Sequence, residues 1–418
     1  MTSFLAPLCL SLGLLNAAPS SQEQKPATAG PTERGFLLPN GWTLTPAGKH
    51  VVLTDLPLNI VPLADSHRAL VATSGYNKHE LSLIDLEQQK VIAREAVAES
   101  WFGLAVSRDQ GHIWWSGGGR GRLHEFALKQ NTLSPEDEKT SFASHPAAAG
   151  RNGARGSHTF RSGLFLDAET QTLYSLDIDA GTISAVDLKS GKVAKSAVCG
   201  GRPYDVVLSR NRAMLYVSDW AGRAVLAVRP EDLHVVSRIA VGEHPNQLAL
   251  HPKDDRLFVA CASTNNVSVI DTKQGVVNET ISTSLFPKAP EGSTPDALAI
   301  APDGKTLFVV NADNNCAAVV DITTPNESQV KGFIPTGWYP TAVAVTPDGK
   351  NLLIGVGKGL QTKANPFTRK PKAAANPRKT AGRRLPFPYI GTTLSGALSI
   401  VPIPDDRTLA TYTAQVYA

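Results

Sequence analysis

A repeated segment is the feature that most restricts what this chain can fold into. A pattern of proline, a short apolar run, a turn and a second apolar run occurs four times in the second half of the sequence. The copies are Pro203–Ser218, Pro245–Ala260, Pro295–Val310 and Pro340–Gly355, and they begin 42, 50 and 45 residues apart. A period of this length is typical of one four-stranded blade of a β-propeller.

Three weaker copies extend the series towards the N-terminus, at Pro57–Thr73, Trp101–Ser116 and Ser162–Leu173. In each unit a turn such as Pro-Asp-Gly reverses the chain, and an Asn- or Gly-rich turn supplies the positive φ of a tight hairpin. One blade cannot bury both faces of its sheet, so the seven units are expected to stack in a ring. The sequence therefore predicts an all-β fold, a seven-bladed β-propeller of four-stranded blades.

The chain is predicted to divide into three segments. Residues 1–18 are expected to be a cleaved export signal, because the apolar run Phe4–Leu15 is too short to span a bilayer and is followed by small and then polar residues. Residues 19–35 are expected to be a polar linker, and 36–418 the propeller. Val51–Leu53 is predicted to close the ring as the outer strand of the last blade, since closure removes exposed strand edges. We expect a periplasmic or secreted protein.

The positive charge of the chain is concentrated in one segment. The formal net charge is +4, but residues 358–384 hold nine basic side chains and no acidic one, which leaves −5 for the remainder. The prolines around them predict an insertion over 358–388 in the last blade. Its candidates for binding an anion or a protein partner are Arg369, Lys370, Lys372, Arg378, Lys379, Arg383 and Arg384. Aromatic residues are not interleaved among them, so specific nucleic-acid binding is not predicted.

The strong copies, together with the Asn-Asn and Val-x-Val-Ile/Val-Asp patterns that follow them, resemble the YVTN-type propeller repeat. The resemblance covers about residues 57–401 and implies the fold rather than a function. Four further segments resemble the propeller half of bacterial two-part proteins that also carry an alkaline-phosphatase-like phosphoesterase domain. These segments are Leu38–Gly48, Leu56–Asn59, Gly357–Leu360 and Tyr389–Gly391. The phosphoesterase domain has no counterpart in this sequence, so the resemblance implies a companion role, with a separate phosphoesterase as a partner.

Polar residues at the start of each inner strand are the candidate site, because propellers place ligands around their central channel. The candidates are Asn59, Arg161, Arg202, Tyr204, Asp205, His244, Asn246, Gln247 and Asp296. In one interpretation they form an oxygen-rich mouth for a cation or a sugar-like ligand. In the other they hydrogen-bond the turns at the start of the inner strands, as Asn and Asp side chains commonly do.

No catalytic, metal-binding or cofactor motif is found in the sequence. CxxC, HxxxH and Gly-x-Ser-x-Gly are absent, and Cys199, Cys261 and Cys316 are predicted to be buried apolar residues. No cofactor or metal is therefore predicted, nor a membrane span. Our first hypothesis is an exported, non-catalytic propeller that binds a small ligand or a protein partner. The alternative is a lactonase-like hydrolase, whose channel chemistry would use the two candidate arginines, His244 and the two candidate aspartates.

Overall fold

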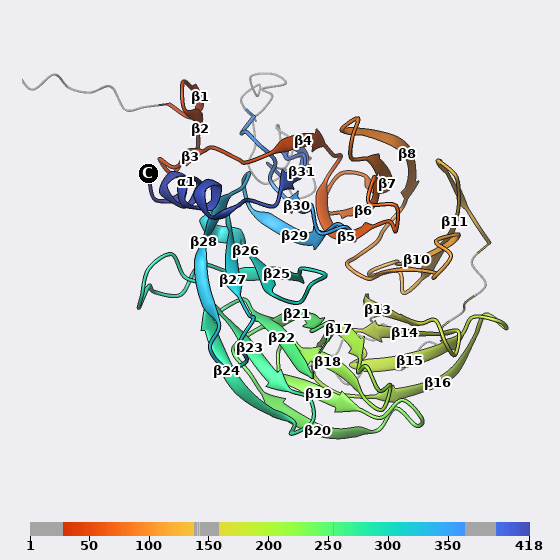
Figure 1. Ribbon diagram of the computed structural model, residues 1–418. Coiled ribbons are helices and arrows are strands. Elements are labelled where there is room, and N and C mark those ends of the chain that lie inside the picture. The colour runs from red at the N-terminus through yellow and green to blue at the C-terminus, as the bar shows by residue number, and fades with distance from the viewer. Residues whose placement is uncertain (1–27, 138–139, 141, 143–158, 254, 364–389) are drawn as a thin grey trace, which may run out of the picture.

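The computed structural model describes residues 28–137, 140, 142, 159–253, 255–363 and 390–418. Seven antiparallel sheets of four strands each are arranged in a ring (Figure 1). The expected export signal and the seven basic candidates of the last-blade insertion lie outside the described residues. The fold is a seven-bladed β-propeller, as the repeat predicted.

The first four blades follow one another in chain order. Blade one consists of β5 (Leu56–Pro62), β6 (Arg68–Ser74), β7 (His79–Asp85) and β8 (Lys90–Val97). Blade two consists of β9 (Leu104–Val106), β10 (His112–Ser116), β11 (Leu123–Lys129) and β12 (Thr132–Pro135). Blade three consists of β13 (Arg161–Asp167), β14 (Thr172–Asp177), β15 (Thr182–Asp187) and β16 (Lys192–Val198). Blade four consists of β17 (Pro203–Leu208), β18 (Leu215–Asp219), β19 (Ala224–Val228) and β20 (Val235–Ala240).

The last three blades complete the ring. Blade five consists of β21 (Pro245–Leu250), β22 (Arg256–Cys261), β23 (Asn266–Asp271) and β24 (Val276–Ser282). Blade six consists of β25 (Pro295–Ile300), β26 (Thr306–Asn311), β27 (Cys316–Asp321) and β28 (Gln329–Pro335), with the short helix η1 (Ala312–Asn314) between β26 and β27. Blade seven consists of β29 (Pro340–Val345), β30 (Asn351–Val356), β31 (Ala397–Pro402) and β4 (Lys49–Val52), and the short helix η3 (Ile390–Thr393) precedes β31.

Strand β4 closes the ring, as the sequence predicted. It pairs antiparallel with β31, and Val51 lies opposite Leu398. Both side chains are buried in the core between blades seven and one. The strand begins two residues earlier than predicted, at Lys49. Because the outer strand and the three inner strands of blade seven come from opposite ends of the propeller sequence, this pairing fastens the two ends together.

Local sequence explains the blade geometry. Four third strands end at an aspartate whose Oδ1 accepts a backbone N–H from the following turn, which is the local bonding expected of Asp in turns. These residues are Asp85, Asp187, Asp271 and Asp321. Large apolar side chains of the second strands, such as Phe258 and Phe308, are fully buried between blades. Cys199, Cys261 and Cys316 are also buried and form no disulfide.

Two elements depart from the sequence-based expectation. The predicted polar linker contains strand β1 (Gly30–Thr32), which forms a small sheet with β2 (Gly35–Leu37) and β3 (Thr43–Leu44). Helix α1 (Asp406–Tyr417), which was not predicted, packs on β28 and buries Leu409 in the core. Among the described residues, neither α1 nor any other helix has the length and apolar character needed to cross a membrane.

Candidate functional site

The seven inner strands surround the axis of the ring (Figure 1), and the end of the central channel at which they begin is here called the mouth. Each inner strand begins at the same end of the ring, so residues at equivalent repeat positions surround the channel. The residues at the first such position are Leu58, Phe102, Ser162, Tyr204, Asn246, Asp296 and Thr341. The repeat therefore brings together residues that are up to 283 positions apart in sequence.

Four of these residues form two contacting pairs. The rings of Phe102 and Tyr204 stack with their centroids 5.0 Å apart, past the small Ser162 of the blade between them. The side-chain Nδ2 of Asn246 donates a hydrogen bond to Oδ1 of Asp296 at 2.9 Å. The mouth thus has an aromatic part, made by blades two and four, and a polar part, made by blades five and six.

Asp296 uses only part of its hydrogen-bonding capacity. Its Oδ2 has no hydrogen-bond partner among the described residues, whereas Oδ1 is held by Asn246. The pKa of Asp296 is raised to about 7, chiefly by burial and in part by nearby Asp313, while the bond from Asn246 opposes both. A carboxyl with this pKa exchanges its proton near neutral pH, so Asp296 can act as either a hydrogen-bond donor or an acceptor there.

Tyr204 complements this carboxyl. Burial raises the pKa of its phenol, and the negative charges of Asp296 and Asp205 raise it further. The hydroxyl is therefore neutral at physiological pH and remains able to donate a hydrogen bond. Together, Tyr204 and Asp296 place a donor, an acceptor and an aromatic face at the mouth.

Sequence reasoning missed a second group of residues beside Asp296. The ammonium of Lys358 lies 3.8 Å from the ring centroid of Tyr339 and 5.5 Å from that of Trp338, both of which are cation–π contacts. Burial raises the pKa of Tyr339 to about 12, and Asp296 and Asp313 also raise it. Burial lowers the pKa of Lys358, whereas Asp313 raises it.

The backbone at three neighbouring entrances to the mouth is strained. His244, Thr294 and Tyr339 each precede the proline that begins an inner strand, and their φ angles are 50°, 55° and 64°. For a residue other than glycine, this left-handed conformation costs about 1–3 kcal/mol. Twelve other described residues besides glycine also have a positive φ, so this conformation does not by itself mark a ligand site. In the sequence, the position before the repeat proline is the signal that would have identified Tyr339.

Three of the predicted site residues instead join neighbouring blades. Oδ1 of Asp205 accepts the N–H of Val206 at 2.8 Å, and Oδ2 accepts the N–H of Leu248 in the next blade at 2.9 Å. Gln247 does the same through Oε1, which accepts the N–H of Leu298 at 2.8 Å. Asn59 donates from Nδ2 to the carbonyl of Phe102 at 2.9 Å. These contacts correspond to the second interpretation above, in which the polar side chains bond the inner strands.

Two of the predicted basic residues, Arg202 and His244, contact groups other than Asp296. Arg202 forms an ion pair with Asp179, with Nη2 and Oδ1 3.0 Å apart. His244 bonds through Nδ1 to Ser263 Oγ at 2.7 Å, and its ring lies 4.2 Å from the ring of Trp220.

Arg161 is buried between blades two and three rather than at the mouth. It is 3% exposed, its guanidinium lies 3.6 Å from the ring centroid of Phe142, and its Nε is 3.7 Å from Asp177 Oδ2. Burial lowers its pKa to about 10, although Asp177 raises it. Within the described part of the chain, therefore, no contact joins Arg161, Arg202 or His244 to a mouth carboxylate. The same residues include no group of three or more potential metal ligands.

Comparisons with known proteins support the fold. Residues 233–374, about a third of the chain, match the family model described as "Lactonase, 7-bladed beta-propeller". Among solved structures, the WD40 repeats of RRP9 match with a TM-score of 0.61 at 12% identity, covering 85% of this chain and 99% of that one. Hydrazine synthase of Kuenenia stuttgartiensis matches with a TM-score of 0.57 at 17% identity, covering 73% and 93%. No curated protein matches the sequence. At these identities the structural matches establish the fold alone.

Proposed function

We propose that this propeller binds a small hydroxylated ligand at the mouth, with Asp296 as the anchoring group. The observation that carries the proposal is that Oδ2 of Asp296 accepts no hydrogen bond from the described residues, whereas both oxygens of Asp205 and Oε1 of Gln247 accept backbone N–H groups. Asp296 is half-buried, so an oxygen that no described residue bonds is available to a ligand.

The chemistry beside Asp296 favours a hydroxylated molecule over a purely charged one. Tyr204 offers a neutral hydroxyl, and its ring, stacked on Phe102, offers an apolar face. A carboxylate, an amide and an aromatic face are a combination suited to sugars and related lactones, which present both hydroxyls and C–H faces. Asn246 holds the carboxylate in place for this contact.

Lactone hydrolysis at the same site is the second candidate function. It is favoured by the match of residues 233–374 to the lactonase family model and by a carboxyl whose pKa of about 7 suits a general base. In such a reaction Asp296 would take the proton of a water molecule as the water oxygen attacks the lactone carbonyl. The ring C–O bond would then break, and the leaving oxygen would take the proton back from Asp296 to give a hydroxy acid. Against it, Arg161, Arg202 and His244 are engaged elsewhere.

The test compares two matched variants in blade six. Asp296→Asn removes the open carboxylate, and Asp303→Asn makes the same change in the β25–β26 turn at the other end of the inner strand, where Oδ1 accepts the N–H of Lys305. Glucose, gluconate and glucono-δ-lactone are screened by thermal shift, and affinities are measured by calorimetry. We expect at least one ligand to bind without turnover, and Asp296→Asn to weaken it about tenfold or more. Asp303→Asn should have no effect.

Two results would change this conclusion. If the wild-type protein and Asp296→Asn bind the ligand with equal affinity, Asp296 is not the anchoring group. Release of acid from the lactone by the wild-type protein, lost in Asp296→Asn and rising with pH through about 7, would establish the hydrolase instead.

We further propose that the chain is exported and acts beside a separate phosphoesterase. The support is the apolar N-terminal segment and the resemblance to the propeller half of two-part proteins. Mass spectrometry of the protein recovered from a secreting host should show a new N-terminus near Pro19. An intact Met1 in the exported fraction would contradict the cleaved signal.

A further inference from the structure

A groove lies between the small N-terminal sheet and blade seven, and we call it the η3 groove. Its walls come from β1, β2 and the β2–β3 loop, from the β28–β29 connection, from the residues after β30, and from η3 with the residue that follows it. Its volume of about 540 Å³ is within the range of small-molecule sites in proteins. Asp296 is not among the described residues that line it, so the groove is separate from the site proposed above.

The walls of the η3 groove are mostly apolar. The larger apolar side chains are those of Pro31, Phe36, Pro39, Trp338, Ile390 and Leu394. Ile390 is 61% exposed. Single exposed apolar residues are common on protein surfaces, but Ile390 belongs to a group that lines one hollow. A grouped apolar surface of this kind indicates a binding site.

Hydrogen bonds fix two of these walls. The backbone N–H of Trp338 donates to the carbonyl of Gly359 at 2.8 Å, which holds the β28–β29 connection against the residues after β30. Asn77, which lies between β6 and β7 of blade one, donates from Nδ2 to the carbonyls of Gly391 and Leu394 at 3.3 and 3.1 Å. A groove whose walls are already held in place loses less binding free energy to the ordering of its own residues.

The charge of the groove favours one kind of ligand. Lys363 is the one charged residue among the described residues that line it. Its Nζ donates to Oγ of Ser395 at 3.3 Å, and no carboxylate of the described residues pairs with it. Residues 364–389, which follow Lys363 in the sequence, contain no Asp or Glu. An ammonium group in an otherwise apolar groove is complementary to an anion that carries an apolar body.

We propose that the η3 groove binds a medium-chain alkyl carboxylate. The alkyl chain contacts Phe36, Trp338 and Ile390, which removes apolar surface of both partners from water. The carboxylate accepts an N–H from Nζ of Lys363 and stays partly in water, because this lysine is exposed. Most of the affinity therefore comes from the chain, and the lysine supplies the preference for an anion over an uncharged molecule.

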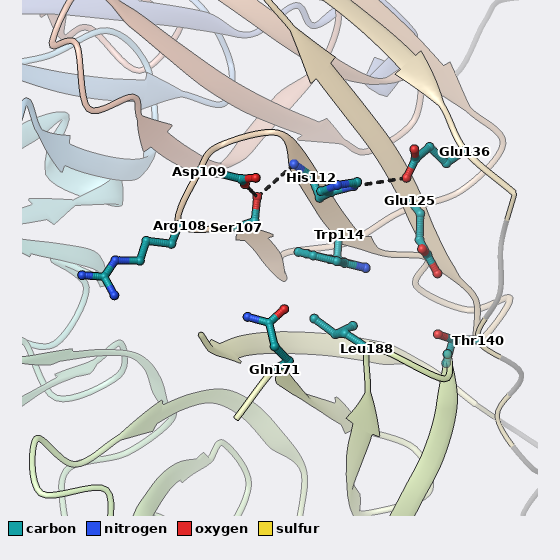
Figure 2. A pocket seen from close by; sticks show the side chains of 11 residues that line it. Ser107, Arg108, Asp109, His112, Trp114, Glu125, Glu136, Thr140, Gln171 and Leu188 are labelled. Carbon is teal, nitrogen blue, oxygen red and sulfur yellow. Dashed lines mark hydrogen bonds and ion pairs between the residues drawn. The ribbon is translucent and has the colours of Figure 1, made fainter. Parts of the chain in front are cut away.

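A cavity between blades two and three provides a comparison (Figure 2). Its volume of about 590 Å³ is similar, and Trp114 lines it as Trp338 lines the η3 groove. Its lining differs in charge, because it includes one arginine and three acidic residues, Asp109, Glu125 and Glu136. Carboxylates repel a bound anion, so the alkyl carboxylate is expected in the η3 groove and not in this cavity.

The experiment follows the tryptophan fluorescence of the full chain during titration with ω-bromooctanoate, because bromine quenches an indole only at close contact. We expect a saturable quench in the wild-type protein that is lost in Trp338→Phe and retained in Trp114→Phe. Asp296→Asn should retain the quench as well, so a failure of the mouth proposal and a failure of this one give different results.

Competition by octanoate and by octanol measures the contribution of charge. Lys363→Gln should weaken octanoate about two- to fivefold, as expected for an exposed ion pair, and leave octanol unchanged. Lys350→Gln removes the same charge from the β29–β30 turn of blade seven, where Lys350 pairs with Asp348, and should leave both affinities unchanged.

Two variants of Ile390 keep the test decisive if Trp338→Phe folds poorly, because this residue is largely exposed. Ile390→Asp and Ile390→Asn remove the same apolar contact, but only the aspartate repels the ligand, so octanoate should bind about threefold more weakly to Ile390→Asp. The proposal is overturned if the wild-type protein shows no saturable quench, or if Trp338→Phe retains all of it. It is also overturned if Lys363→Gln binds octanoate as tightly as the wild-type protein, or if the two Ile390 variants bind it equally.

Discussion

The inner strands of blade four and blade six each carry an aspartate near their start, Asp205 and Asp296. The two aspartates differ in the hydrogen bonds that their carboxylates accept. Burial raises the pKa of both Asp205 and Asp296 to about 7. Asp205 accepts two backbone N–H groups, one from Val206 and one from Leu248 in the next blade. Asp296 accepts one bond, from the side chain of Asn246. A raised pKa therefore does not distinguish a carboxyl that bonds the inner strands from one that is available to a ligand. The number of hydrogen bonds that each carboxyl accepts does distinguish them.

The largest expected effect that tests this comparison is on stability. Asp205→Ala should lower the free energy of unfolding by about 2–3 kcal/mol, because two buried backbone N–H groups lose their acceptor. Asp296→Ala should lower it by less than about 1 kcal/mol, since only the amide of Asn246 loses a partner. Urea unfolding followed by fluorescence measures both. Equal losses in the two variants would mean that the two carboxyls have the same role.

The pH dependence of stability sharpens the comparison. The folded protein binds the Asp296 proton more tightly than the unfolded chain, whose pKa is near 3.8. The stabilisation is therefore complete below a pH of about 4 and is lost as the pH rises through about 7. Each such group lowers the free energy of unfolding by at most about 1.4 kcal/mol per pH unit within that window.

Urea unfolding between pH 4 and pH 8 measures this slope, and Asp296→Asn should make the decline shallower. Carboxyls whose pKa is lowered, such as Asp65 and Asp348, act in the opposite direction but below that window. They therefore do not mask the effect. An identical slope in the wild-type protein and Asp296→Asn would show that the carboxyl titrates as it does in the unfolded chain.

The smallest expected effect concerns the start of the inner strand of blade five, the blade between blades four and six. Gln247→Leu should lower the free energy of unfolding by about 1 kcal/mol, because the N–H of Leu298 loses its acceptor across the blade boundary. Gln274→Leu changes an exposed residue of the same blade and should alter stability by less than about 0.5 kcal/mol. A negligible loss for Gln247→Leu would mean that water replaces the side chain at this entrance.

Much of the fold was predictable because its determinants are local. Apolar runs and turn residues recur in each repeat, and aspartates such as Asp271 end four of the third strands, so the blades and the closing strand β4 followed from the pattern. Helix α1 was not predicted, because it is a single element outside the repeat and is held by tertiary contacts such as the bond from Phe333 N–H to Thr413 Oγ1. The small sheet β1–β3 was likewise outside the repeat.

The candidate site was predictable in position but not in the role of each residue. Repeat alignment identified Tyr204, Asn246 and Asp296, which the structure brings together at the mouth. It did not identify Tyr339 or Lys358, since one precedes the aligned segment and the other follows it in the chain. Their contact arises only when blade seven folds.

The sequence by itself determined that seven similar blades form a closed ring and that polar residues surround one end of the channel. Both follow from residue types at fixed spacing, which act within a single blade. Only the tertiary structure decided that Asp205 is bonded and Asp296 is open, because the relevant partners belong to neighbouring blades.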